Sequence, residues 1–103
     1  MANRQKILEE ILIIEDKINT LLRDQTYLKI KRNLNSLEKG MYGSPIAKVD
    51  SPYDMTKVLT MRRHSSEMKE VISKYKDRRS EYEDKITALQ TRKEKLQKQL
   101  FLG

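Results

Sequence analysis

The chain has 103 residues and a formal net charge of +7 at pH 7; 36% of its residues are charged, 6% are aromatic and none is cysteine. A chain of this length forms one small domain, and so high a charged fraction favours long solvated helices over a large private core. The lack of cysteine excludes disulfides, thiolate metal sites and cysteine nucleophiles.

The first predicted helix spans residues 4–39. Asn3 before it has a short polar side chain that favours a helix N-cap. Apolar residues then recur at alternating spacings of four and three, which is typical of one helix face. The stripe changes phase at Gln25, and Gly40 is suited to end the helix. Its two parts are Ile7, Ile11, Ile14, Ile18 and Leu21, then Tyr27, Ile30, Leu34, Leu37 and Met41.

Residues 40–51 are predicted to form a connector. Two glycines and Pro45 interrupt helical geometry there, and Ser44 before the proline favours an extended or turn conformation. The short run 46–49 is the one candidate for a paired strand.

The second predicted helix spans residues 52–101. Ser51 is placed to cap it, Pro52 suits the first helical position, and Asp54 lies three residues after the cap. A spacing of three and four then continues from Val58 to Leu100, with ten of thirteen positions apolar. A stripe of this length predicts a helix packed in the manner of a coiled coil.

These elements predict an all-α fold, an antiparallel two-helix coiled-coil hairpin forming one domain over residues 1–103. If the helices meet at the connector, Ile7 lies near residue 84, and roughly 14 residues of the second helix, about 20 Å, have no internal partner. We therefore expect the hairpin to be completed by oligomerisation or by docking on a partner.

The predicted partner-binding residues come from this overhang and from four consecutive apolar residues, 11–14, which cover more than one helix stripe. A longer first arm, a frayed terminus or a few exposed leucines on a small protein are the alternative explanations. The predicted set is Leu8, Leu12, Ile13, Leu22, Leu96, Leu100, Phe101 and Leu102.

The basic residues suggest a different surface. Residues 55–103 hold thirteen Lys/Arg against seven Asp/Glu, so the second predicted helix carries most of the excess charge. Such a helix suits nucleic acid, an acidic protein surface or anionic lipid, and net charge alone does not choose among them; we expect no membrane partner. Tyr75 and Tyr82 lie among these residues but belong to the apolar stripe. The candidate contacts are Arg62, Arg63, Lys74, Lys76, Arg78, Lys85, Arg92 and Lys93.

No catalytic constellation, cofactor motif or metal-ligand spacing is recognisable, and His64 is the single histidine. We therefore expect a protein that is not an enzyme and that binds no cofactor, metal or small-molecule substrate. No apolar run approaches the length of a membrane span. The expected location is the cytoplasm, or a virion if the protein is derived from a phage.

The function that the sequence favours is a non-enzymatic protein–protein interaction module, acting as an adaptor, inhibitor or structural component. A basic nucleic-acid-associated regulator is the first alternative. The outline of two coiled-coil helices around a short middle segment also resembles that of prefoldin subunits, whose helices hold unfolded clients at their tips. This resemblance implies a holding chaperone, although prefoldins assemble through strand-forming hairpins and this connector offers only residues 46–49. Small accessory proteins of bacteriophages share the Lys/Ile-rich two-helix character.

Overall fold

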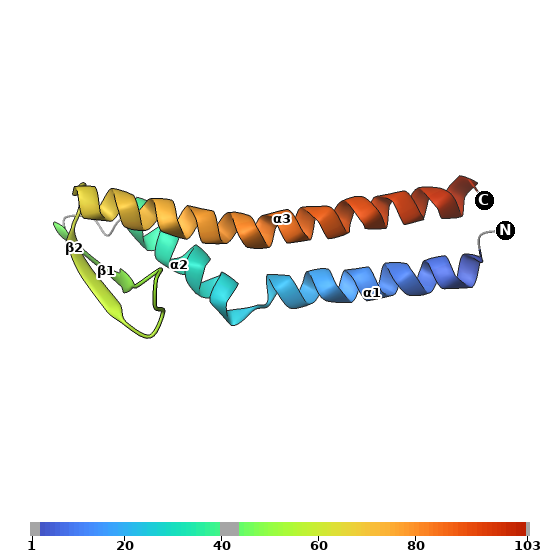
Figure 1. Cartoon of the computed structure of the whole chain (residues 1–103), viewed down its shortest axis with the longest axis horizontal. Coiled ribbons are helices and arrows are strands. Elements are labelled where there is room, and N and C mark those ends of the chain that lie inside the picture. Colours follow the sequence, from blue (N-terminus) through green and yellow to red (C-terminus); the bar gives the residue numbers. More distant parts are fainter. Residues whose placement is uncertain (1–2, 40–43, 103) are drawn as a thin grey trace. The chain divides into compact units, whose positions relative to one another are not determined.

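The computed structural model describes residues 3–39 and 44–102 (Figure 1). The described residues fold as two compact units. We call residues 3–24 and 82–102 the helical unit and the described residues within 25–81 the hairpin unit. The elements in chain order are α1 (Arg4–Leu22), α2 (Gln25–Lys39), β1 (Ile46–Asp50), β2 (Val58–Arg62) and α3 (Ser66–Leu102), and α3 contributes to both units.

The prediction of an all-α two-helix hairpin was wrong, because the chain contains a two-stranded antiparallel sheet between its helices. The predicted strand at residues 46–49 is present as β1. Its partner β2 lies where a helix was expected. The fold is therefore mostly helical, with a β-hairpin in the middle of the chain.

The first predicted helix is in fact two helices. The predicted N-cap is confirmed, since the Asn3 side chain accepts a hydrogen bond from the Gln5 N–H at 3.0 Å. α1 ends where the Arg23 N–H bonds back to the Asn19 carbonyl, and α2 begins at Gln25, the residue at which the apolar stripe changes phase. Gly40, predicted to end the helix, lies outside the described residues.

The second predicted helix starts fourteen residues later than expected, at Ser66. Its cap is Ser65, whose hydroxyl oxygen accepts the Met68 N–H at 3.1 Å and donates to the Arg62 carbonyl at 2.6 Å. His64 before it has a φ of 63°, the left-handed conformation that turns the chain from β2 into α3. Ser51, predicted to cap this helix, instead stabilises the turn between the strands.

The hairpin unit has a closed core. β1 and β2 pair in a register that sets Ala47 opposite Met61, and β1 packs on α2. Figure 1 shows β1 between β2 and α2, so that β2 is the outer strand. Among the described residues, the largest fully buried side chains belong to this unit, and they are Tyr75, Ile30, Leu34 and Leu37.

Polar contacts fix the β-hairpin to both helices of its unit. Tyr75 of α3 donates its hydroxyl to the Asp50 carbonyl, and burial raises the pKa of Tyr75 to about 12, with the Asp50 carboxylate adding to the rise and Arg78 opposing it. Asn33 of α2 donates to the Asp50 carboxylate at 3.1 Å. Arg78 donates to the Pro52 carbonyl at 2.7 Å. The end of β1 is thereby held from two sides.

The helical unit is an antiparallel pair formed by α1 and the part of α3 from Tyr82 onward. The predicted stripe is buried in α1, with Ile7, Ile11, Ile14 and Ile18 each 7% exposed. Surface ion pairs join Glu10 to Arg92 at 3.5 Å and Glu15 to Lys93 at 3.2 Å.

These ion pairs correct the predicted register. Ile7 was expected near residue 84, but Glu10 and Glu15 lie beside Arg92 and Lys93, so the start of α1 runs along the last turns of α3. The β-hairpin uses residues that were assigned to the second helix, which shortens that helix to 37 residues. The expected unpartnered overhang of the second helix is therefore wrong. Among the described residues, no helix is long and apolar enough to cross a membrane.

Candidate interaction surfaces

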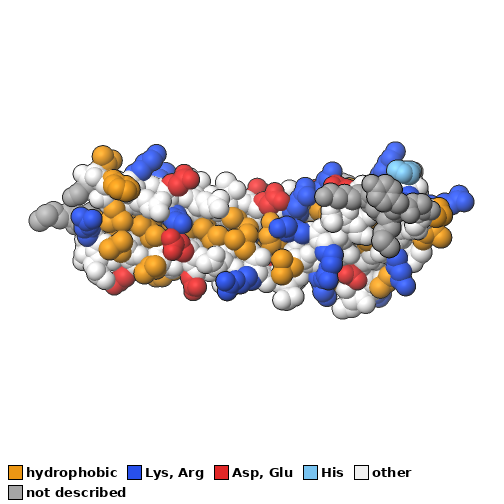
Figure 2. All heavy atoms as spheres, turned by 180° about the vertical axis from the view of Figure 1, so that it is seen from behind, with side chains coloured by type: hydrophobic (Ala, Val, Ile, Leu, Met, Phe, Trp, Pro, Cys, Tyr) orange, Lys and Arg blue, Asp and Glu red, His pale blue; other side chains and the backbone are white. Residues whose placement is uncertain are grey.

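α1 carries more apolar surface than its contact with α3 covers. Leu8, Leu12, Ile13 and Leu22 are 44%, 63%, 55% and 43% exposed. At about 100° per residue, Leu8, Leu12 and Leu22 fall within about 80° of the helix circumference, whereas Ile13 lies about 100° beyond Leu12. We call Leu8, Leu12 and Leu22 the α1 flank. Figure 2 shows hydrophobic side chains gathered in a band along the helical unit.

A shallow hollow lies along the middle of α1. It is lined by the two apolar residues Leu12 and Ile13 together with Glu15, Asp16 and Asn19. Glu15 is already paired with Lys93. The exposed leucines of α1 are thus bordered by acidic and amide side chains, the usual surroundings of an apolar patch on a protein surface.

The four remaining predicted partner-binding residues lie near the end of α3 and differ in their exposure. Leu96 is buried and Leu100 is half-buried, so both lie within the helical unit rather than on its surface. Phe101 and Leu102 are 91% and 88% exposed. Six of the eight predicted residues are therefore accessible, four on α1 and two at the end of α3.

Most of the candidate basic contacts are engaged inside the protein. Lys76 pairs with Glu38 at 3.2 Å, and Arg92 and Lys93 pair with α1. Arg63 and Arg78 donate to backbone carbonyls. The other three candidate residues, Arg62, Lys74 and Lys85, are exposed.

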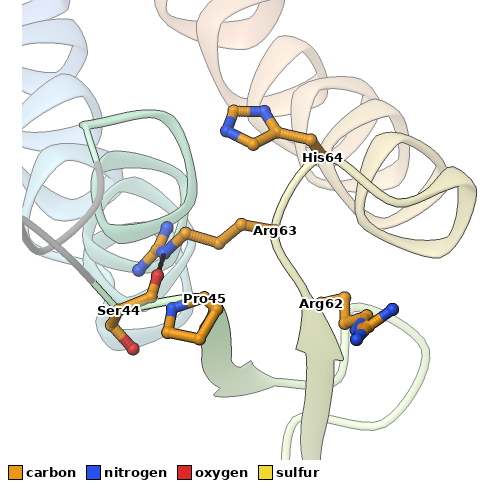
Figure 3. Close-up of a pocket in the computed structure, with 5 residues that line it drawn as sticks. All are labelled: Ser44, Pro45, Arg62, Arg63 and His64. Carbon is orange, nitrogen blue, oxygen red and sulfur yellow. Dashed lines mark hydrogen bonds between the residues drawn. The ribbon is translucent and has the colours of Figure 1, made fainter.

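The basic segment 62–64 lines an open pocket with Ser44 and Pro45 (Figure 3). Arg63 points to the Ser44 carbonyl, to which its Nε donates at 2.9 Å, while Arg62 points to the opposite side. His64 extends away from both arginines. These three side chains do not converge on one point, so the pocket lacks the geometry of an anion clamp.

The net charge is concentrated in one unit. Residues 25–81 hold thirteen Lys/Arg and seven Asp/Glu, a net charge of +6, while residues 1–24 and 82–103 hold nine and eight, a net charge of +1. The sequence placed this excess on the second helix. It belongs to the segment that forms α2, the β-hairpin and the first part of α3.

Sequence reasoning missed β2 as a candidate surface, because it assigned residues 58–62 to a helix. The β-branched residues Val58 and Thr60 were a signal for a strand. The Asp54 carboxylate, in the turn before β2, accepts bonds from the Thr56 N–H and hydroxyl, which lower its pKa.

Within residues 3–39 and 44–102, no group of three or more His, Asp or Glu side chains is placed to hold a metal ion. No protein-family model, curated protein or solved structure matches the chain. The candidate surfaces therefore have to be interpreted from their own chemistry.

Proposed function

We propose that the protein is a non-enzymatic interaction module that binds a second copy of itself or a larger protein assembly through the α1 flank. The observation that carries this proposal is the exposure of leucines on a helix whose neighbouring face is already buried. Binding at the flank removes three leucine side chains from water, each contributing about 1 to 2 kcal/mol when fully covered. The exposed Phe101 and Leu102 extend the apolar surface of the same unit.

The proposed role is that of an adaptor, inhibitor or structural component in the cytoplasm, or in a virion if the protein is phage-derived. The hollow between Leu12 and Ile13 supports this role, because an apolar side chain of a partner fits a depression bordered by polar groups. A partner helix lying along α1 would also reach Glu9 and Asp16, which are exposed.

The test compares two double variants of the full chain, Leu8→Gln with Leu12→Gln and, as the matched control on the far side of α1, Lys6→Gln with Lys17→Gln. Light scattering should show an oligomer for the wild type and the control, and a monomer for the leucine variant. If the partner is another protein, affinity capture should lose it only with the leucine variant. A wild-type monomer that captures the same proteins as the leucine variant contradicts the proposal.

Nucleic-acid binding is the second candidate function, and the net charge of +6 on the hairpin unit favours it. Binding to phosphates should weaken steeply as salt rises, because counterions are released. A mixed-sequence DNA or RNA probe that shows no mobility shift at low salt removes this candidate. The exposed Arg62, Lys74 and Lys85 are the residues to change if a shift is seen.

A prefoldin-like holding chaperone is the third candidate. The specific observation in its favour is the β-hairpin between the helical segments, an element that the prefoldin outline requires. A chaperone of this kind should suppress aggregation of a heat-unfolded model protein at comparable molar concentrations. Unchanged aggregation contradicts this role and leaves the first proposal intact.

A further inference from the structure

The outer edge of β2 is an unfilled strand position. Flanking bonds run from the Arg63 N–H to the Pro45 carbonyl and from the Ser51 N–H to the Lys57 carbonyl. Hydrogen-bonded pairs alternate along an antiparallel ladder. With the observed register, the N–H and C=O groups of residues 58, 60 and 62 therefore point away from β1.

The outward backbone groups of Val58 and Thr60 are open on β2, whereas the outward carbonyl of Arg62 is engaged. The Arg62 carbonyl accepts bonds from Ser65. Among residues 3–39 and 44–102, no hydrogen bond is found to the backbone groups of Val58 and Thr60 on this side. Open strand edges of this kind are templates for another strand.

The opposite edge of the hairpin is partly covered, because two of its carbonyls accept side-chain hydrogen bonds. On β1 the Ser44 hydroxyl donates to the Ile46 carbonyl, and the Tyr75 hydroxyl donates to the Asp50 carbonyl. β1 also packs on α2. The edge of β1 is thus partly occupied by α2 and by side chains, while the edge of β2 is more accessible.

We propose that the edge of β2 binds an extended acidic segment of a partner protein as a third strand of the sheet. Backbone hydrogen bonds supply affinity in such strand addition, and alternate side chains supply selectivity. This surface is distinct from the α1 flank, so the proposal does not depend on the function proposed above.

Charge selects the acidic partner over a second copy. β2 and its flanks carry Lys57, Arg62 and Arg63, and Lys48 lies beside Thr60 in the register. Acidic residues near the strand are already engaged, since the Asp50 carboxylate accepts from Asn33 and the Asp54 carboxylate from Thr56. A second copy would bring another hairpin unit of net charge +6 to this edge.

The two faces of the sheet define the side chains of the added strand. On the outer face, Val58, Thr60 and Arg62 are exposed, and a neighbouring strand there should carry Asp or Glu. On the inner face, Met61 is buried and Leu59 is half-buried, so an apolar residue of the added strand would cover Leu59. Because side chains alternate along a strand, the predicted segment alternates acidic and apolar residues.

The experiment uses the isotope-labelled full chain and a capped heptapeptide of alternating glutamate and valine. Amide signals of Val58, Thr60 and Arg62 should shift most on titration. A heptapeptide of alternating lysine and valine should bind at least about tenfold more weakly.

Three variants separate backbone pairing from charge. Thr60→Pro removes an outward N–H without removing a bond to β1 and should abolish the shifts, while Thr60→Val keeps that N–H and should bind normally. Unchanged exchange protection at Leu59 and Met61 shows that the hairpin persists in the proline variant. Arg62→Glu should weaken the glutamate peptide and strengthen the lysine peptide.

Several results overturn the proposal. These are the absence of shifts at about 1 mM peptide, equal binding of the two peptides, and a concentration-dependent dimer that Thr60→Pro dissolves. Displacement of the glutamate peptide by a single-stranded oligonucleotide overturns it as well. The Leu8→Gln and Leu12→Gln variant should bind the peptide as the wild type does, so loss of the α1 interaction and loss of strand pairing are distinguishable.

Discussion

The helical unit and the hairpin unit bury their apolar residues to different extents. In the helical unit, two helices meet along one stripe, and its four isoleucines each retain 7% exposure. In the hairpin unit, α2, the β-hairpin and the first part of α3 surround a core in which Ile30 and Tyr75 are 0% exposed. Two helices alone cannot enclose a side chain on all sides, whereas a third layer can.

The two units also differ in net charge. The unit with the closed core has a net charge of +6, and the unit with exposed leucines has a net charge of +1. Self-repulsion therefore acts on the hairpin unit, while the helical unit has almost no net charge. The proposed functions follow this contrast, with apolar docking proposed for the helical unit and charge-based binding for the hairpin unit. The following changes test the difference in burial and polar contacts between the two units.

The largest effect should come from truncating the core of the hairpin unit. Leu34→Ala should lower the free energy of unfolding by about 2 to 5 kcal/mol, because it leaves a cavity at a side chain that is 2% exposed. The matched change Leu12→Ala, at 63% exposure, should alter it by less than about 0.5 kcal/mol. Urea denaturation of both variants measures the difference. Equal losses would show that the α1 flank is part of a core.

The next effect concerns Tyr75, which links α3 to β1. The pKa of Tyr75 is raised to about 12 from 10.0, so the folded protein holds this proton more tightly than the unfolded chain. Stability from this group is fully present below pH 10 and is lost as the pH rises toward 12, with a total loss of about 1 to 3 kcal/mol.

The variant Tyr75→Phe isolates this contribution. It should cost about 1 kcal/mol at pH 7 through loss of the bond to the Asp50 carbonyl. Between pH 10 and 12 its stability should fall less steeply than that of the wild type, as measured by urea denaturation across that range. Parallel pH profiles for the two proteins contradict the assignment.

A smaller effect should distinguish the two helix caps. Ser65→Ala removes a hydroxyl that bonds both to Met68 and to Arg62 and should cost about 1 to 2 kcal/mol. Asn3→Ala removes one bond at the exposed start of α1 and should cost about 0.5 to 1 kcal/mol. Thermal unfolding followed by circular dichroism compares them. A larger loss for Asn3→Ala would contradict the view that the start of α3 anchors the β-hairpin.

Local signals predicted α1 well. The cap at Asn3, the buried stripe from Ile7 to Ile18 and the phase change at Gln25 are all present in the structure. Each depends on neighbours three or four residues apart. Patterns of this short range predict a helix and its buried face without knowledge of the rest of the fold.

The region from Ser51 to Ser65 was misassigned because its local signals fit two structures. Val58 and Met61 are spaced as on a helix face, yet they lie on opposite faces of β2. Ser51 accepts bonds from the Tyr53 and Asp54 N–H groups, as a helix cap does, but the following residues turn back toward the strand. Pairing with β1 decides between these outcomes, and pairing is not a local property.

The candidate surfaces likewise include some that local sequence patterns predict and others that depend on long-range contacts. Exposed leucines on α1 followed from the width of its apolar pattern, but the burial of Leu96 depends on the register with α1. The contacts of Arg63 and Arg78 with backbone carbonyls could not be predicted, since their acceptors lie nineteen and twenty-six residues away. The open edge of β2 required knowledge of both strands.

The smallest effect should come from the ion pairs of the helical unit. Glu10 and Arg92 are 3.5 Å apart, with side chains 51% and 63% exposed. Water screens such a pair, so Glu10→Gln should change the free energy of unfolding by less than about 0.5 kcal/mol. The change should shrink further in high salt, as measured by urea denaturation at two salt concentrations. A loss above about 1 kcal/mol that persists in high salt would mean that a partner buries this pair, and the helical unit would then be bound along α3 as well as along α1.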